Sequence, residues 1–432
     1  LQLALPQHER TESCLAGNHQ SHPIMKHRLF VVILALLCLL VTGSACQGPW
    51  GKKNNHRTVI IYMEANNNLS QWSHTNMNDL LVNASDVNME DGRLMLFMNT
   101  AKSKRLYEIE PYKSNKGGYR GDTVLLEQYQ FTTALEKNAM REVLQDAMQA
   151  APADEYALIL WSHSTGWLPE DIEIKESSYI RAAGEPEMPI TKNFGMDGRK
   201  SISYLDIARA IEGLGLDMMM IDACFGTCVE ALYDLRNVCD YVVASPIEIL
   251  GAGYPYADLM SVFFDKDLTI PMLGEAVCRA YMQYYRQYTF QGTPYPYGAI
   301  SLIDLSKMDA LAQATREVMQ KCQDTPIDHK KVQALENRYY SLYYDFYHYI
   351  QQLTKEESSD IFTTFARCFE QCVVYHDHSE KLYSNLNGYS TRALDNSYGL
   401  SSYIPRPGHS SYFDRCDQAY FETNWAKYIY GH

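Results

Sequence analysis

The stretch "MIDACFGTCVE", residues 220–230, sets an acidic residue and a cysteine directly after an apolar run. Together with Met218 and Met219 the run is apolar without alternation, which is typical of a strand that helices cover on both faces. Asp222 ends the run, and Cys224 follows two residues later. The stretch therefore predicts a buried strand of a parallel sheet, with a carboxylate and a thiol at its carboxyl end.

Strand-like runs alternate with helical patterns along the rest of the chain. Besides residues 218–222, the expected strands are 58–65, 93–99, 156–162, 241–245, 297–305 and 398–405, with a hairpin over 105–128. The expected helices cover about 72–85, 133–150, 203–212, 226–236 and 272–288, and residues 307–378 are predicted to be mainly helical. This alternation predicts an α/β fold in which helices cover both faces of a largely parallel central sheet, with a helical C-terminal part.

A second polar cluster follows another apolar run and supplies a histidine. In open α/β sheets the active site lies outside the carboxyl ends of the strands. "WSHSTGW", residues 161–167, occupies such an end and contains His163. A cysteine nucleophile needs an acid/base partner and a site for the oxyanion. We therefore predict that His163 and Cys224 form a catalytic dyad. An anion beside a thiol raises the thiol pKa, so Asp222 is predicted to bind a positive group of the substrate instead.

Composition excludes several classes of function. The 432 residues carry a formal net charge of −14, so most of the surface would repel a nucleic acid, and cationic substrates fit better. Of eleven cysteines, eight lie beyond residue 46, too few for a disulfide scaffold. There is no C-x-x-C pair for structural zinc, and the G-x-S-x-G, H-E-x-x-H and P-loop motifs are also missing. We expect a monomer that needs no cofactor.

The N-terminal region has the pattern of an export signal. Met25 precedes Lys26 and Arg28 and then thirteen apolar residues, 29–41. A membrane-spanning helix needs about 20 such residues, so a signal peptide is favoured. "TGSAC", ending at Cys46, resembles a bacterial lipobox whose cysteine is lipidated, although cleavage after Ala45 stays open.

The chain is thereby divided into four parts. Residues 1–24 are interpreted as an upstream over-extension, 25–46 as the signal peptide with its lipobox, 47–57 as a linker, and 58–432 as the functional domain. The protein is expected in the cell envelope as a lipoprotein, periplasmic or on the outer surface, and otherwise secreted. Contact with a membrane is expected through the lipid anchor alone.

Four stretches in order resemble the clostripain family of cysteine peptidases, relatives of caspases and gingipains. They are "VIIYMEANNNLS", "PADEYALILWSHSTGW", "IDACFGTCVEALYDLRNVCDYVVAS" and "YGLSSYIP…NWAKYI", and they span about residues 58–430. The resemblance implies a caspase-like α/β/α sandwich, a dyad of His163 and Cys224, and hydrolysis after basic residues, with Asp222 at the floor of the specificity pocket. Ser164 stands where the family usually has a glycine whose N–H helps to bind the oxyanion. Any residue except proline offers that N–H.

Several assignments around this site remain open. Glu248, in the loop after the strand 241–245, is a candidate for a second wall of the basic pocket. The acidic run 169–173 is either a Ca²⁺ site, since some relatives use Ca²⁺, or a solvated loop. The polar segment 168–203 is a long loop. It is either an exposed surface loop or the place where the enzyme cuts itself, with Arg181 as the first choice.

One rival hypothesis assigns the chain to a different class of protein. The chain could be a catalytically weak or inactive, surface-anchored binding lipoprotein that keeps a peptidase scaffold, because fold does not imply function. Loss of the dyad would be its signature, and both dyad residues are present.

Overall fold

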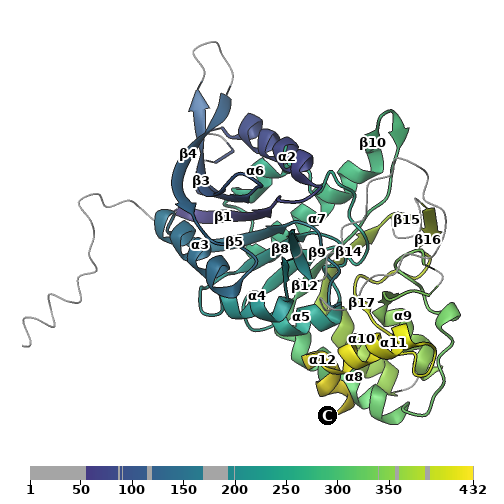
Figure 1. Ribbon diagram of the computed structural model, residues 1–432. Coiled ribbons are helices and arrows are strands. Elements are labelled where there is room, and N and C mark those ends of the chain that lie inside the picture. The colour runs from purple at the N-terminus through teal and green to yellow at the C-terminus, as the bar shows by residue number, and fades with distance from the viewer. Residues whose placement is uncertain are drawn as a thin grey trace, which may run out of the picture. The chain divides into compact units, whose positions relative to one another are not determined.

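Nine strands form a single sheet in the computed structural model (Figure 1). The structure describes residues 55–85, 88–89, 91–113, 119–168, 193–198, 200–338, 340–355, 360–384 and 390–431. In their order across the sheet they are β14 (Val373–His378), β12 (Ala299–Asp304), β9 (Tyr241–Ala244), β8 (Met218–Asp222), β5 (Ala153–Trp161), β1 (Asn55–Glu64), β2 (Gly92–Asn99), β3 (Lys104–Lys113) and β4 (Tyr119–Tyr129). The five strands from β9 to β2 are parallel, and two antiparallel strands extend the sheet on either side. The predicted parallel core is confirmed.

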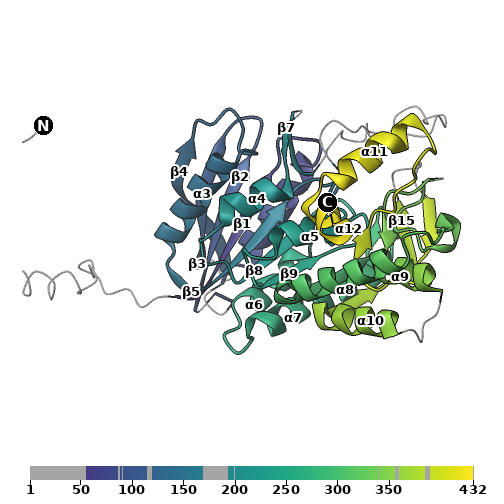
Figure 2. The same cartoon turned by 90° about the horizontal axis from the view of Figure 1, so that it is seen from below.

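Helices cover both faces of the sheet and complete three layers (Figure 2). One face packs against α2 (Ser70–Asn83), α6 (Tyr256–Phe263) and α7 (Ile270–Gln287). The other packs against α3 (Lys137–Ala150), α4 (Tyr204–Ile211), α5 (Val229–Leu235) and α8 (Met308–Lys321). Successive side chains of a strand point to opposite faces. In β1, Ile60 and Tyr62 therefore join one core and Ile61 and Met63 the other, all fully buried. This explains why its sequence is apolar throughout.

The C-terminal part is helical, as predicted, but strands and turns separate its helices. It contains α9 (Phe346–Thr354), α10 (Asp360–Cys372), α11 (Ser411–Phe421) and α12 (Asn424–Tyr430). Residues 373–378, predicted as helix, form β14, because "VVY" favours a strand and finds an open edge beside β12. The stretch 340–349, which is rich in tyrosine, becomes helical only at Phe346, where the Asp345 side chain accepts the His348 N–H and caps α9.

Four short ladders lie outside the main sheet. β13 (Tyr344–Asp345) pairs with β17 (Ser401–Ser402), so the strand predicted over 398–405 is short and does not join the central sheet. The other three ladders are hairpins: β6 (Phe194–Asp197) with β7 (Lys200–Ile202), β10 (Thr289–Phe290) with β11 (Thr293–Pro294), and β15 (Lys381–Ser384) with β16 (Ser390–Ala393).

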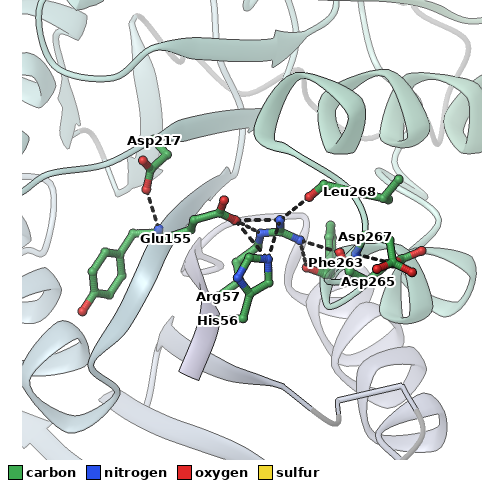
Figure 3. A network of polar contacts seen from close by, with 9 residues as sticks. His56, Arg57, Glu155, Asp217, Phe263, Asp265, Asp267 and Leu268 are labelled. Atoms are coloured by element: carbon green, nitrogen blue, oxygen red, sulfur yellow. Dashed lines mark hydrogen bonds and ion pairs between the residues drawn. The ribbon is translucent and has the colours of Figure 1, made fainter. Parts of the chain in front are cut away.

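Arg57, near the start of β1, is the centre of a network of polar contacts at the amino edge of the sheet (Figure 3). This edge lies at the opposite end of the strands from the predicted site. Its side chain is fully buried and its Nε donates to Oε2 of Glu155 at 2.9 Å. The two terminal nitrogens donate to the backbone oxygens of Phe263 at 2.9 Å and Leu268 at 2.7 Å. A buried guanidinium is tolerated only with such partners. Arg57 thus joins β1, β5 and the connection between α6 and α7.

The signal peptide, the lipobox and most of the linker fall in the unit 1–53 or at residue 54, outside the described residues. The division of the chain at residues 24, 46 and 57 therefore stays a prediction. Within the described part, every helix is too short or too polar to span a lipid bilayer.

Candidate active site

The register of β5 and β8 brings the two predicted catalytic residues to one edge. The strands are parallel neighbours, and Trp161 of β5 pairs with Asp222, the last residue of β8. His163 and Cys224 each lie two residues beyond this pair. They therefore emerge from adjacent strands at matching positions, at the carboxyl edge of the sheet, as predicted.

Cys224 lies in a tight turn between β8 and α5. The turn is tied to the segment after β9 by bonds from the Phe225 N–H to the Ile247 oxygen, 3.1 Å, and from the Thr227 N–H to the Ser245 oxygen, 3.2 Å. Phe225 has a φ of +56°, which is uncommon for a residue with a side chain. A strained residue of this kind persists only where its surroundings enforce it, and such residues cluster at functional sites.

The thiol of Cys224 faces the segment after β9. Its Sγ accepts the Ile249 N–H at 3.4 Å. Burial and, after it, the charge of Glu248 raise the pKa of this thiol to about 12, although the Ile249 N–H lowers it in part. The thiol is therefore protonated at neutral pH, and a base must remove its proton before it can act as a nucleophile.

His163 is held by a residue that sequence reasoning did not single out. Its Nε2 lies 2.7 Å from Oδ1 of Asn68, in the loop between β1 and α2. An amide oxygen only accepts, so Nε2 carries the proton and Nδ1 keeps a free lone pair. Burial lowers the pKa of His163 to about 4, so the ring is neutral at pH 7. The only signal for Asn68 was its place in the polar cluster "NNN" that closes the first predicted strand.

Asp222 is buried and bonded to the segment 253–256. Its Oδ2 accepts the Tyr254 N–H at 3.1 Å and the Tyr256 hydroxyl at 2.8 Å. Gly253 has a φ of +69°, and a Cβ there would lie 2.8 Å from the same oxygen, so this close approach requires glycine. Burial raises the pKa of Asp222 to about 6. The carboxylate is therefore still largely ionised at neutral pH.

Glu248 is the second carboxylate near the thiol. Its Oε1 accepts the Ser384 hydroxyl, at the end of β15, at 2.6 Å. Both Glu248 and Asp222 raise the pKa of Cys224 by their charge. The structure thus places two carboxylates in electrostatic reach of one thiol.

Ser164 stands in a short antiparallel bridge to Phe194. The flanking bonds run from the Thr165 N–H to the Asn193 oxygen and from the Gly195 N–H to the His163 oxygen, both 2.9 Å. Neither uses the Ser164 N–H. Ser164 does not belong to the described residues with positive φ, so its backbone does not require the glycine that the family usually has there.

Tyr343 joins the histidine loop to the cysteine turn. Its ring stacks on that of Phe225, with centroids 3.9 Å apart and planes within 7°. Its hydroxyl donates to the Thr165 oxygen at 2.5 Å. Tyr343 is completely buried, so it also has a packing role. No local pattern of the sequence indicates its contact with both loops.

The remaining candidates divide by where they lie. Cys228 is fully buried at the start of α5, which fits a packing role. Cys46, the acidic run 169–173 and Arg181 lie outside the described residues. Within the described ranges, no cluster of three His, Cys, Asp or Glu side chains could hold a metal ion.

Comparison with known proteins identifies a family and a fold. The model of the clostripain family, Peptidase_C11, matches residues 61–424. A secreted C11 cysteine protease from Bacteroides thetaiotaomicron, "iotapain", is 21% identical with a TM-score of 0.72, and the match covers 88% of this chain and all of that one. An inactive zymogen C11 protease from Parabacteroides distasonis is 24% identical with a TM-score of 0.69, covering 88% and 99%. No curated protein matches the sequence significantly. The solved structures support the caspase-like fold.

Proposed function

We propose a specificity and a catalytic dyad for this chain, which belongs to the clostripain family and is a cysteine peptidase of that family. It cuts peptide bonds after arginine or lysine, with Cys224 as the nucleophile and His163 as its base. The observation that carries the proposal is a pair of carboxylates whose charges both act on the thiol. Asp222 lies two residues before Cys224, and Glu248 precedes Ile249, whose N–H donates to Sγ. A basic side chain of the substrate would be attracted to the same two groups that oppose ionisation of Cys224.

The reaction follows from the protonation states of the site. The neutral thiol passes its proton to Nδ1 of His163 while Sγ attacks the carbonyl carbon. The Ser164 N–H donates to the oxyanion that forms. The C–N bond then breaks, and His163 returns the proton to the leaving amine, which leaves a thioester on Cys224. Water activated by His163 hydrolyses the thioester and restores the free thiol.

The Asp222→Asn variant tests the basic specificity. A charge-assisted hydrogen bond contributes about 1.5 to 3 kcal/mol, so kcat/KM for arginine peptides should fall about tenfold to a hundredfold while neutral peptides are spared. Asp309→Asn is the matched control, since Asp309 is exposed on α8 and pairs with Arg236. Equal loss on both kinds of peptide, or loss in the control, would exclude Asp222 as the specificity carboxylate. Glu248→Gln should show the same selectivity with a smaller factor.

The pH dependence offers an independent check. The pKa of Asp222 is about 6, so its negative charge appears as the pH rises through 6. For arginine peptides kcat/KM should rise over this range more steeply than for neutral peptides, and Asp222→Asn should remove the difference.

Export is proposed to end with a lipid on Cys46. The lipobox-like "TGSAC" supports this, and iotapain is described as secreted. The Cys46→Ser variant should move from the membrane fraction to the soluble fraction. The domain is proposed to act as a monomer without an obligatory cofactor.

Self-cleavage at Arg181 is proposed because the segment 168–203 carries basic residues directly after the histidine loop. A C11 relative is described as an inactive zymogen. Wild type should yield two fragments and Cys224→Ala one chain. Loss of cleavage after the same preparation is dialysed against a chelator would support a Ca²⁺ site in the acidic run 169–173.

A further inference from the structure

Five aromatic rings form a continuous wall beside the candidate active site. They are Trp72 in the first turn of α2, Phe290 in β10, Tyr295 and Tyr297 after β11, and Tyr383 in β15. Neighbouring centroids are separated by 6.3 Å from Trp72 to Phe290, 6.5 Å from Phe290 to Tyr295, 6.2 Å from Tyr295 to Tyr297 and 5.7 Å from Tyr297 to Tyr383. Segments far apart in the sequence thus supply one surface, which we call the aromatic wall.

The aromatic wall reaches solvent, unlike the tyrosines of the nearby core. Phe290 is 43% exposed, and the other four members are half-buried. By contrast, Tyr281 and Tyr285 of α7 are completely buried. Exposing several rings side by side is unfavourable in water, and such patches commonly mark binding surfaces. Each ring also brings a large apolar area with few rotatable bonds, which suits it to binding.

Two contacts place the aromatic wall next to the thiol. A Cβ on Gly251 would lie 2.6 Å from Nε1 of Trp72, so that indole packs directly on the segment after β9. Two residues earlier in this segment, the Ile249 N–H donates to Cys224. At the other end of the wall, Ser384, the neighbour of Tyr383, bonds to Glu248.

The arrangement of elements agrees with these contacts. Figure 1 shows the start of α2, the hairpin of β10 and the hairpin of β15 and β16 on the side of the molecule toward which β1 points. The carboxyl ends of β5 and β8 lie at the same edge, because β1, β5 and β8 are parallel. The wall therefore continues the surface that surrounds Cys224.

We propose that the aromatic wall is a substrate subsite that binds apolar or aromatic side chains flanking the basic residue of the peptide. The proposal rests on the proposed function, because its occupant is the peptide held at Cys224. A peptide fits this surface because Tyr295 and Tyr297 add hydroxyl groups able to bond a peptide backbone beside the apolar rings. The preferred substrate is thus a basic residue within an apolar context.

Four matched peptides test this subsite. They are added to the full chain with the Cys224→Ala substitution, which is expected to bind the peptides without cleaving them. Each has a central Arg or Ala, flanked on both sides by Phe or by Gly, and its Kd is measured by calorimetry. Phe flanks should bind more tightly than Gly flanks. Adding Phe290→Ala should weaken the Phe-flanked peptides about threefold to tenfold, as for the loss of one aromatic contact, and should leave the Gly-flanked peptides unchanged. Phe290→Tyr should keep the preference.

Leu125→Ala is the control variant, since Leu125 is 50% exposed on the edge strand β4 and should change nothing. Equal affinity for Phe and Gly flanks overturns the subsite, whatever the central residue. Equal affinity for Arg and Ala centres overturns the basic specificity instead, so the two failures are distinct. If Phe290→Ala changes the sedimentation coefficient and leaves peptide affinity intact, the wall is a contact between copies and the inference is wrong.

Discussion

Cys224 and His163 are both neutral at physiological pH, because burial holds the pKa of the thiol at about 12 and that of the imidazole at about 4. In the free enzyme the proton is therefore bound to Sγ of Cys224 and not to the imidazole. We expect the alkylation rate of Cys224 by iodoacetamide to rise steadily with pH up to at least pH 9, as the thiolate fraction grows. The rate is read by mass spectrometry of the Cys224 peptide. A rate that is already constant from pH 5 upward would mean a preformed thiolate–imidazolium pair and would contradict this description.

Asn68 fixes which nitrogen of His163 carries the proton, which under the proposed mechanism leaves Nδ1 to act as the base. Replacing Asn68 by Ala removes an acceptor 2.7 Å from Nε2 and frees the ring to rotate or change tautomer. One hydrogen bond contributes about 0.5 to 1.5 kcal/mol, so kcat should fall about threefold to tenfold with KM little changed. Asn68→Asp keeps the acceptor and adds a negative charge, which should raise the His163 pKa and shift the acid limb of the pH profile to higher pH. Unchanged kcat and pH profile in both variants would remove Asn68 from the site.

Among single residues, the sequence predicts those whose position follows from the register of neighbouring strands. His163 and Cys224 could be paired because each follows an apolar run, and parallel strands end at one edge. Asn68 could not be chosen, because three asparagines stand in a row and only the path of the loop decides which one meets the imidazole.

Tyr343 connects the loop that carries His163 to the turn that carries Cys224, and the proposed mechanism needs these two in a fixed relation. Tyr343→Phe keeps the stacking on Phe225 and loses the bond to the Thr165 oxygen, two residues from His163. We expect a loss of about 1 kcal/mol in unfolding free energy, together with a lower kcat. Tyr343→Leu also loses the stacked ring, so both effects should be larger. Urea unfolding and steady-state kinetics measure them, and Tyr349→Phe, a buried tyrosine of α9, is the control. Reduced stability with unchanged kcat in both Tyr343 variants would limit Tyr343 to a packing role.

Elements were predictable where apolar patterning is strong and local. The parallel strands were found because helices bury both of their faces, which leaves uninterrupted apolar runs. β14 was missed because its residues sit within a helical context and become a strand only by pairing with the distant β12. The contact of Tyr343 with Thr165 joins residues 178 apart, which no local pattern reveals.

Across the whole molecule, buried carboxyl groups link stability to pH. Burial raises the pKa of Glu64 and of Glu230 to about 8 and that of Asp345 to about 7. In the unfolded chain these groups titrate near pH 4, so between pH 4 and 8 the folded state binds more protons and stability falls as the pH rises. Buried histidines with lowered pKa values act in the opposite direction, but only below about pH 6.5.

The urea midpoint should therefore fall between pH 6.5 and 8.5, with a loss in unfolding free energy on the order of 4 kcal/mol. Glu230→Gln imitates the protonated side chain and should reduce the difference. A midpoint that rises over this range would show that these carboxyls are ionised in the folded protein.

The central claim is that Cys224, served by His163, is the nucleophile of this peptidase. Its most direct test is labelling with an irreversible arginine peptide ketone, followed by intact mass and peptide mapping. We expect one adduct on Cys224, no adduct in Cys224→Ala, and much slower labelling in His163→Ala. An adduct on Cys228, Cys322 or Cys368 in wild type, or labelling that persists in Cys224→Ala, would contradict the claim.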